Sequence, residues 1–551
     1  MRGTPAIYRL PSSHFGPASE TARPCPYDAA TAYGGASGLD LWRPLVTVAQ
    51  SRSGPPRRRG RPVATYDEPA GAARPVVLDA AGRHLVRRFS GGLTPALAKQ
   101  VKRVGGARAW FEQQLRPGRV ADAPGADVDS WFPRLRMTPK QVFQADRDGR
   151  IGAWEVATDL SRWTVARRIA SNRQVQEVMV DFWSNLLNVA LFHDEAMYWR
   201  TDYDRVIRAH ALTSFEQLLQ AAITHPAMGL YLDNAGSSKD SPNENLGREL
   251  LELHTVGVDG GYTEEHVKAS ARMLTGYRVD VWHPEFRAFY DKSWHDTQPV
   301  RILGFHHAND AADGRAATTA LLSYLARHPA TAERIARRLC VKFVSDQPSP
   351  AIVAAVAQAY RDNGTAIKPT LRALVDHPDF AAGAGQKVRT PTEDYVATVR
   401  ALGIRLQAPR SDGSFANAMY WQYSEAGQPP YEWATPDGYP EDDRSWSSAG
   451  RLLTGFAIHR DLAARWWPTE EARFPKQASL LPTMPATLGK VVDHVGLRVL
   501  GQTPPAATRD GIAELLGKSL ATRLTKDEAL EYWTLRGILS SLLDSPVHLH
   551  R

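Results

Sequence analysis

The 551-residue chain carries 67 basic and 59 acidic residues, and its formal net charge of +8 is a small excess for this length. Without a nucleic-acid reader motif, so small an excess makes nucleic-acid binding the least favoured class. The two cysteines, Cys25 and Cys340, lie far apart, which excludes a disulfide framework and a cysteine-based metal site. No apolar run is long enough for a transmembrane helix and no signal peptide is visible, so the sequence as written predicts a cytoplasmic protein.

Residues 1–77 are rich in Pro, Gly, Ala and Arg and show little hydrophobic periodicity. They include the basic run Pro55-Pro-Arg-Arg-Arg-Gly-Arg-Pro62. Such a segment buries too little apolar surface to offset the entropy lost on ordering it. We therefore predict a disordered tail over residues 1–77 and one large helical domain over residues 78–551.

Helical periodicity is sustained over residues 151–189, where no proline interrupts it and two long helices are expected. In the second of these, Asp181, Asn185 and Asn188 form one polar stripe, and the other sides are apolar and include Trp183. A helix of this kind is usually buried, and each unpaired polar group in it would cost about 1–3 kcal/mol. We therefore expect the stripe to contact polar groups from another part of the chain.

The stretch from Ser241 to Thr255 predicts the central helix of the domain. Ser241 suits an N-cap, Pro242 suits the first helical position, and Glu244 stands where a capping box places its carboxylate. We expect the helix to continue to about Thr255. After the glycine pair at 260–261, a second helix would complete a helical hairpin.

One face of this central helix is polar. At 100° per residue, Asn245, Glu249 and Glu252 share a narrow sector with Arg248 at its edge, whereas the leucines occupy a different sector. The face carries two carboxylates, an amide and a guanidinium. The groups that these side chains contact decide whether the protein is an enzyme.

Residues 278–312 lack helical periodicity and contain His295 and Asp296. Long irregular segments inside helical domains are often functional. A second irregular segment, residues 427–440, is rich in proline and aromatic residues and predicts an extended loop. No convincing alternating strand occurs, so the predicted fold class is all-α, with many helices, long irregular loops and a disordered N-terminal tail.

Two strings indicate a family. Residues 243–263 read Asn-Glu-Asn-Leu-Gly-Arg-Glu-Leu-Leu-Glu-Leu-His-Thr-Val-Gly-Val-Asp-Gly-Gly-Tyr-Thr, and residues 271–277 read Ala-Arg-Met-Leu-Thr-Gly-Tyr. Together they resemble the hallmark of the bacterial domain-of-unknown-function family 1800 (DUF1800), over about residues 78–551. Five shorter pieces agree: Phe182-Trp183 with Asn185, His225–Asn234, Lys342–Asp346, Lys387–Pro391 and Gln428–Pro440.

The resemblance implies little about chemistry, because the activity of the family is not established. Members are often exported and often encoded beside an alkaline-phosphatase-like protein, which implies export and a companion protein of that type. This chain has Trp294-His-Asp-Thr-Gln-Pro299 where relatives tend to carry a His-Asp-Pro-Gly-like turn. His295 and Asp296 still match that motif.

We expect a site between the helix that contains Asp181 and the helix from Ser241 to Thr255. Carboxylates and a histidine in a cleft could hold a divalent metal ion or divide acid and base roles. The expected metal ligands are Glu249, Glu252, His295, Asp296 and Asp181. The expected catalytic residues are Glu249, Glu252, Asn245 and Arg248, the last as a substrate clamp. The expected substrate-binding residues are Asn185, Asn188, Asp233, Asn234 and Trp183.

Two functional hypotheses follow. The first is a metal-assisted hydrolase or oxidoreductase at that site. The second is a non-catalytic helical scaffold or binding module that works with a partner protein, in which the same polar groups form a buried structural network. The structural alternative to a site is that Glu244, Arg248 and Glu252 pair with one another on a solvated helix face. Two observations distinguish these possibilities: whether Glu249 is buried, and which groups lie around it.

Overall fold

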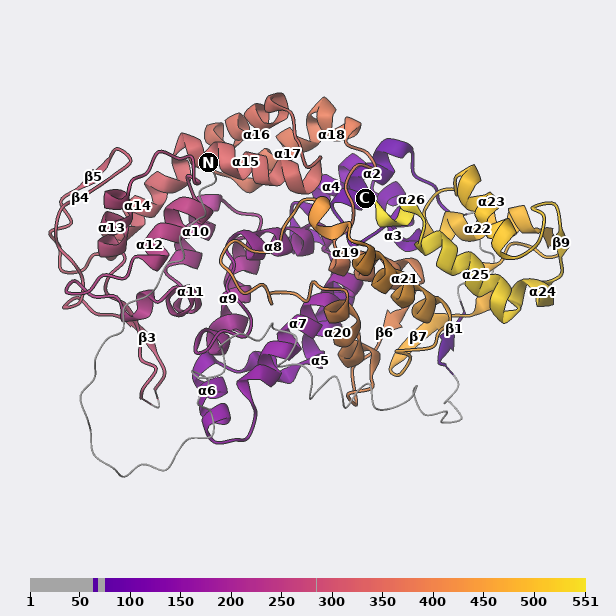
Figure 1. Cartoon of the computed structure of the whole chain (residues 1–551), viewed down its shortest axis with the longest axis horizontal. Helices are drawn as coiled ribbons and strands as arrows, with labels where there is room; N and C mark the ends of the chain where they lie inside the picture. Colours follow the sequence, from indigo (N-terminus) through magenta and orange to yellow (C-terminus); the bar gives the residue numbers. More distant parts are fainter. Residues whose placement is uncertain (1–62, 68–74, 284) are drawn as a thin grey trace, which may run out of the picture. The chain divides into compact units, whose positions relative to one another are not determined.

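The computed structural model describes residues 63–67, 75–283 and 285–551. Most of the predicted disordered tail, residues 1–77, lies outside these ranges. The described chain is mostly helical with a few short strands, which confirms the predicted all-α class (Figure 1). The two long helices predicted over residues 151–189 are also confirmed, as α7 and α8.

The helices have the following bounds. The first group comprises α2 (Ala80–Arg88), α3 (Pro95–Arg103), α4 (Ala107–Gln114), α5 (Ala123–Trp131), α6 (Pro139–Arg147), α7 (Ala153–Ala170) and α8 (Gln174–Leu186). The second comprises α9 (Ala196–His210), α10 (Phe215–Ile223), α11 (Pro226–Tyr231), α12 (Asn245–Glu249), α13 (Glu264–Met273), α14 (Arg315–Arg327), α15 (Pro329–Phe343), α16 (Pro350–Asp362), α17 (Ile367–Asp376) and α18 (Pro378–Ala382). The third comprises α19 (Pro391–Ala401), α20 (Phe415–Glu425), α21 (Ala449–Ala463), α22 (Leu488–Val499), α23 (Ala506–Leu515), α24 (Lys526–Leu530), α25 (Tyr532–Leu543) and α26 (Pro546–Leu549).

Buried apolar side chains form two clusters. One includes Phe89, which follows α2, and Trp183 of α8, and it extends through the helices of the second group. The other includes Leu160 of α7 and Tyr423 of α20 and extends through the third group. Since α7 and α8 are joined by a short turn, the two clusters adjoin, and α19 packs on α7 and α21 (Figure 1). This junction is where the polar side chains described below are buried.

The central helix differs from its prediction. It begins at Asn245 rather than at Ser241, because the side chain of Asn243 accepts a hydrogen bond from the Asn245 N–H at 2.9 Å and holds a turn there. Beyond Glu249 it continues as a π-helix, η5 (Leu250–His254). The wider turn of a π-helix changes the angular spacing on which the predicted polar sector was based. The predicted hairpin is confirmed, since α12 packs against α13.

The segment predicted to be irregular, residues 278–312, contains two small antiparallel hairpins. They pair β2 (Tyr277–Val279) with β3 (Ala288–Tyr290), and β4 (Val300–Ile302) with β5 (Phe305–His307). Strands of three residues are too short to show alternation in the sequence.

Three further short strands form a sheet in the order β1-β7-β6. Strand β1 (Thr65–Tyr66) runs parallel to β7 (Ala472–Pro475), and β6 (Arg405–Leu406) runs antiparallel to it. Strand β1 therefore lies upstream of the predicted domain start at residue 78. The remaining strands, β8 (Ala486–Thr487) and β9 (Arg523–Leu524), pair with each other.

The structure explains why glycine occupies position 247 in the string at residues 243–263. A Cβ placed on Gly247 would lie 2.7 Å from the backbone nitrogen of Ala271 and 3.0 Å from the carbonyl oxygen of Val267, so the close approach of α12 and α13 requires glycine.

Replacing Gly247 by alanine is expected to lower the free energy of unfolding by about 1–3 kcal/mol, because backbone atoms would have to move. Helix propensity alone acts in the opposite direction, by about 1 kcal/mol. Gly450 of α21 has open space around its Cβ position, so Gly450→Ala is the matched control and should be neutral or stabilising. Chemical denaturation of the two variants measures the difference. A Gly247→Ala protein as stable as Gly450→Ala would contradict the packing explanation.

Candidate functional site

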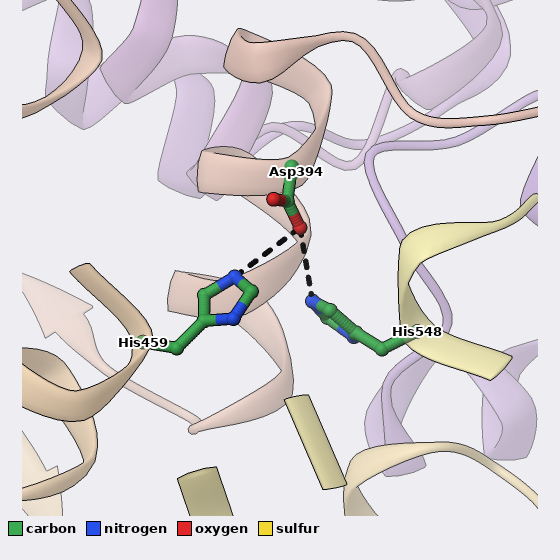
Figure 2. Close-up of side chains that lie close together, drawn as sticks. All are labelled: Asp394, His459 and His548. Atoms are coloured by element: carbon green, nitrogen blue, oxygen red, sulfur yellow. Dashed lines mark ion pairs between the residues drawn. The ribbon is translucent and has the colours of Figure 1, made fainter. Parts of the chain in front are cut away.

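Three side chains from distant parts of the chain meet in the interior. Asp394 lies on α19, His459 on α21 and His548 on α26, and all three point toward one another (Figure 2). Their exposed fractions lie between 1% and 4%. Titratable groups this deeply buried require partners of opposite charge or a metal ion.

The two histidines approach the same carboxylate oxygen. The distance from Asp394 Oδ1 to His459 Nε2 is 3.3 Å, and that to His548 Nε2 is 3.4 Å. All three ligand atoms lie within 4.8 Å of one another. A tetrahedral zinc ion with bonds of about 2.0–2.1 Å separates its ligand atoms by about 3.3–3.4 Å. Asp394 Oδ1 is buried and its polar neighbours are these two imidazole nitrogens, so the spacing fits a metal centre.

A second layer of groups orients the three side chains. Asp544, which follows α25, lies 2.8 Å from His459 Nδ1 and fixes the orientation of that ring. A carboxylate on the far nitrogen of a ligating histidine is the usual arrangement in metal sites. Arg451 donates to Asp394 Oδ2 at 3.3 Å. The hydroxyl of Thr398 lies 2.9 Å from His548 Nε2 and would have to release that nitrogen for a metal.

The protein groups give the two imidazoles different charges. Burial lowers the pKa of His459, but Asp394 and Asp544 on either side raise it by more, to about 9. Burial lowers the pKa of His548 to about 4, although Asp394 opposes this effect. At neutral pH and with protein groups alone, His459 is therefore a cation between two carboxylates, and His548 is neutral. A metal ion would replace the proton on His459.

The sequence positions the cluster through two local features. Thr390 and Glu393 form a capping box that begins α19, which places Asp394 in its first turn. The end of the chain pairs with the segment before α19: the Arg389 N–H donates to the Leu549 carbonyl at 2.8 Å, and the Arg389 side chain donates to the His548 carbonyl at 2.8 Å. This cluster was not predicted from the sequence, because its members belong to no common motif. The nearest signal was the string at residues 387–391, shortly before Asp394.

A buried ion network lies on the other side of the same helix turn. Lys342 of α15 is 2% exposed, and its Nζ lies 3.1 Å from Glu393, 2.9 Å from Glu441 and 3.5 Å from Asp181. Burial opposes the charge of Lys342, but these three carboxylates raise its pKa above the ordinary value. The C-terminal Arg551 completes the network at 2.6 Å from Glu393.

The polar stripe of α8 finds its partners here. Asp181 pairs with Arg168 of α7 at 2.6 Å. Asn185 donates to the Tyr439 carbonyl at 2.8 Å and accepts from the Tyr439 N–H at 2.6 Å. Asn188 donates to the carbonyls of Trp433 and Thr435 at 3.0 and 2.8 Å. The stripe therefore contacts the loop at residues 428–441 as well as α7 and α15.

Gly438 allows this loop to approach α8. It has a φ of +73°, and a Cβ there would lie 2.1 Å from the carbonyl oxygen of Asn185.

The side chains predicted to be catalytic lie on the partly exposed face of α12 and η5. Burial raises the pKa of Glu249, and the neighbouring Glu252 and Asp437 add to this effect. Glu252 accepts a hydrogen bond from the Tyr262 hydroxyl at 2.9 Å. Asp437 belongs to the loop that covers α8, so the pKa of Glu249 responds to a charge on that loop.

Arg248 and Asn245 have partners close in the chain. Arg248 lies 2.6 Å from Glu264 and 3.2 Å from Glu244, so it joins α12 to α13. Asn245 donates to Asp233 at 2.9 Å. The structure thus brings Asn245 together with Asp233, one of the predicted substrate-binding residues.

The other predicted site residues lie in separate environments. His295 is buried, with Nδ1 at 3.2 Å from the Thr275 carbonyl and Nε2 at 3.1 Å from Asn309 Oδ1. The side chain of Asp296 accepts from the Gln298 N–H at 2.9 Å. No hydrogen bond or ion pair among the described residues joins His295 or Asp296 to Glu249 or Glu252.

The side chains of Trp183 and Asn234 donate hydrogen bonds to backbone carbonyls. Trp183 is fully buried in the first apolar cluster and donates to the Ala211 carbonyl at 3.0 Å. Asn234 donates to the Leu274 carbonyl at 3.0 Å. Each of these contacts ties together segments that are distant in sequence.

The fold and these contacts define a large helical protein with a buried ion network and an adjoining Asp-His-His cluster. A family model described as "Protein of unknown function (DUF1800)" matches residues 84–549, and the chain belongs to that family. No curated protein and no solved structure matched it. In the described part of the chain, no helix has both the length and the apolar character needed to cross a bilayer.

Replacing Lys342 by methionine is expected to lower the free energy of unfolding by about 3–5 kcal/mol, because three carboxylates would lose their shared cation in the interior. Lys268→Met is the matched control, since Lys268 pairs with Glu265 at 3.1 Å on the surface, where water and salt screen the pair and its loss should change stability little. Chemical denaturation measures both. Equal effects of the two substitutions would show that the network is not stabilising.

The same network predicts a pH dependence. Burial raises the pKa of Glu393, but Arg551 and Lys342 lower it by more, from 4.5 to about 2. A carboxylate with a depressed folded-state pKa stabilises the fold above its unfolded pKa, and this contribution disappears as the pH falls toward the folded value. Thermal unfolding of the wild type between pH 5 and about 2 should therefore show a loss of stability that is reduced in Lys342→Met.

Proposed function

We propose that this protein binds one divalent transition-metal ion, zinc by its donor set, through Asp394, His459 and His548. The observation that carries the proposal is the approach of both Nε2 atoms to one buried oxygen, Asp394 Oδ1, at 3.3 and 3.4 Å. Two imidazoles and one carboxylate are a common zinc donor set. Asp544 supports it by fixing the ring of His459.

The ion would have a structural role. Its three ligands come from α19, α21 and α26, so it would join the last helix of the chain to the centre of the protein. The cavity beside His548 has a volume of about 10 Å³ and is lined in part by Arg389, Ala397 and Val547. This space holds about one water molecule, which could complete the coordination, but it does not admit an organic substrate.

The metal would also support the ion network. Glu393 and Asp394 are adjacent on α19, and His548 and Arg551 are close together at the C-terminus. An ion that fixes Asp394 and His548 would hold Arg551 near Glu393, where the two charges lie 2.6 Å apart. Metal binding and the burial of Lys342 should then stabilise each other.

We expect the purified protein, after incubation with zinc and removal of excess metal, to retain about one zinc ion per chain, as a single closed site would. His459→Gln and His548→Gln should lose it, and a chelator should lower the melting temperature of the wild type only. Mass spectrometry of the metal content and thermal unfolding measure the two effects. Asp204→Asn is the matched control, because Asp204 is an equally buried carboxylate that accepts from Tyr431 at 2.9 Å, away from the cluster.

Asp544→Asn separates a metal centre from an ion-pair cluster. It keeps all three ligands and should weaken zinc binding by about 10–100-fold, as loss of a supporting carboxylate does at other sites. A wild-type protein that retains no zinc, and whose melting temperature a chelator does not change, would show that the cluster is a histidine cation held between Asp394 and Asp544.

A second candidate function is the metal-assisted hydrolase or oxidoreductase proposed from the sequence, at Glu249 and Glu252. It is favoured by the raised pKa of Glu249, to which burial, Glu252 and Asp437 contribute. A site there would use the rim formed by the loop at residues 428–441.

The alternative, a scaffold that acts with a partner protein, is supported by the structural contacts of the same side chains. An alkaline-phosphatase-like companion and export are proposals that follow from family membership.

Glu249→Gln and Glu252→Gln decide which centre holds the metal. If the ion lies at the Asp-His-His cluster, both variants should retain the wild-type zinc content, because neither side chain contacts the cluster. Metal analysis of the two variants, compared with His459→Gln, gives the answer. Loss of zinc from the glutamate variants and its retention in His459→Gln would transfer the metal to the acidic face of α12 and η5.

A further inference from the structure

A ligand-sized cavity lies apart from the acidic face of α12 and η5, and it shares Ala401 and Val499 with the small cavity beside His548. Its volume is about 500 Å³, and it is lined by parts of α3, α5, α22 and α25, the turn between α7 and α8, and the chain from the end of α19 to β6. Cavities that bind small molecules in proteins have volumes of roughly 300–1,000 Å³. Its walls are largely apolar and include Leu97, Trp131, Ile169, Leu480, Val495 and Leu539.

One wall carries a positive charge without a carboxylate partner. The guanidinium of Arg400, at the end of α19, donates to the Ile169 carbonyl at 2.6 Å and lies 3.4 Å from the Gly92 carbonyl. Among the described residues, no acidic side chain pairs with it. Burial lowers the pKa of Arg400 to about 10, so it remains protonated at neutral pH. A half-buried cation that contacts only neutral carbonyls is incompletely compensated.

A second cation lines the same cavity. Arg405 of β6 stacks over the ring of Tyr66, with 3.7 Å between its Cζ and the ring centroid, and it forms no ion pair with the described residues. Arg498 also lines the cavity, but it already has a partner and is not needed here. The acidic side chain on the lining is Asp127, which is exposed. The charge in the cavity is therefore positive on balance.

We propose that this cavity binds an aliphatic monocarboxylate, with its carboxylate between Arg400 and Arg405 and its hydrocarbon chain along the apolar walls. A guanidinium forms strong charge-assisted hydrogen bonds with a carboxylate, and two arginines at one end fix the orientation of the ligand. The leucine, isoleucine and valine side chains offer a favourable environment to methylene groups and not to a sugar or a base. This binding activity is independent of the proposed metal centre.

Isothermal titration of the full-length protein with decanoate tests the proposal, and decanol is the neutral comparison. We expect decanoate to bind at least tenfold more tightly than decanol, because only decanoate offers a charge to the arginines. Arg405→Gln and Arg400→Gln should each weaken decanoate binding about tenfold or more and leave decanol binding nearly unchanged. Arg473→Gln is the matched control. Arg473 of β7 lies opposite Arg405 in the register of the β6–β7 strand pair but does not line the cavity.

A variant that fills the cavity tests the apolar part. Ala170 lines the cavity at the end of α7, and Ala170→Phe should abolish binding of both decanoate and decanol. If Arg400→Gln fails to fold, Arg405→Gln, at an exposed position, and Ala170→Phe still test the proposal. The proposal is overturned if decanoate does not bind, if decanol binds as tightly, if Arg405→Gln binds decanoate like Arg473→Gln, or if adenosine monophosphate displaces decanoate at equal concentration.

Discussion

The buried charge of Lys342 is the interaction on which the centre of this protein depends. Its ammonium group is withdrawn from water, so it is stable only because carboxylates from α8, from α19 and from the segment after the 428–440 loop approach it. Lys387 repeats the arrangement nearby, with Asp346 and with Asp443 at 2.8 Å. Two buried lysines therefore hold together the short strings at residues 342–346 and 387–391 and the segment at 441–443, which follows the loop at 428–440.

The C-terminus links this network to the Asp-His-His cluster. Successive residues of a helix point about 100° apart, so Glu393 faces Lys342 while Asp394 faces His459 and His548. Arg551 donates to the Lys342 carbonyl at 3.0 Å and so closes the network from the end of the chain. His548 and Arg551 are thus both part of the interior, and a contact that holds His548 in place also holds Arg551.

The string at residues 243–263 has a different role in the structure. Gly247 lets α12 lie against α13, and Arg248 joins the two helices through Glu264. Its glutamates lie on a partly exposed face, close enough to the loop at 428–440 for Asp437 to raise the pKa of Glu249. By contrast, the ion network, the Asp-His-His cluster and the cavity beside Arg400 all use side chains of α19.

The sequence by itself determined the helical class, the two long helices α7 and α8, the α12–α13 hairpin and the need of the α8 stripe for buried partners. All of these follow from the spacing of apolar residues, caps and glycines within one or two dozen positions. Only the tertiary structure decided that the partners of Asn185 and Asn188 are backbone groups of the 428–441 loop and that Asp394, His459 and His548 meet. It also decided that His295 is enclosed by Thr275 and Asn309. Such contacts join residues far apart in the chain, where no local periodicity records which side chains the packing of helices will bring together.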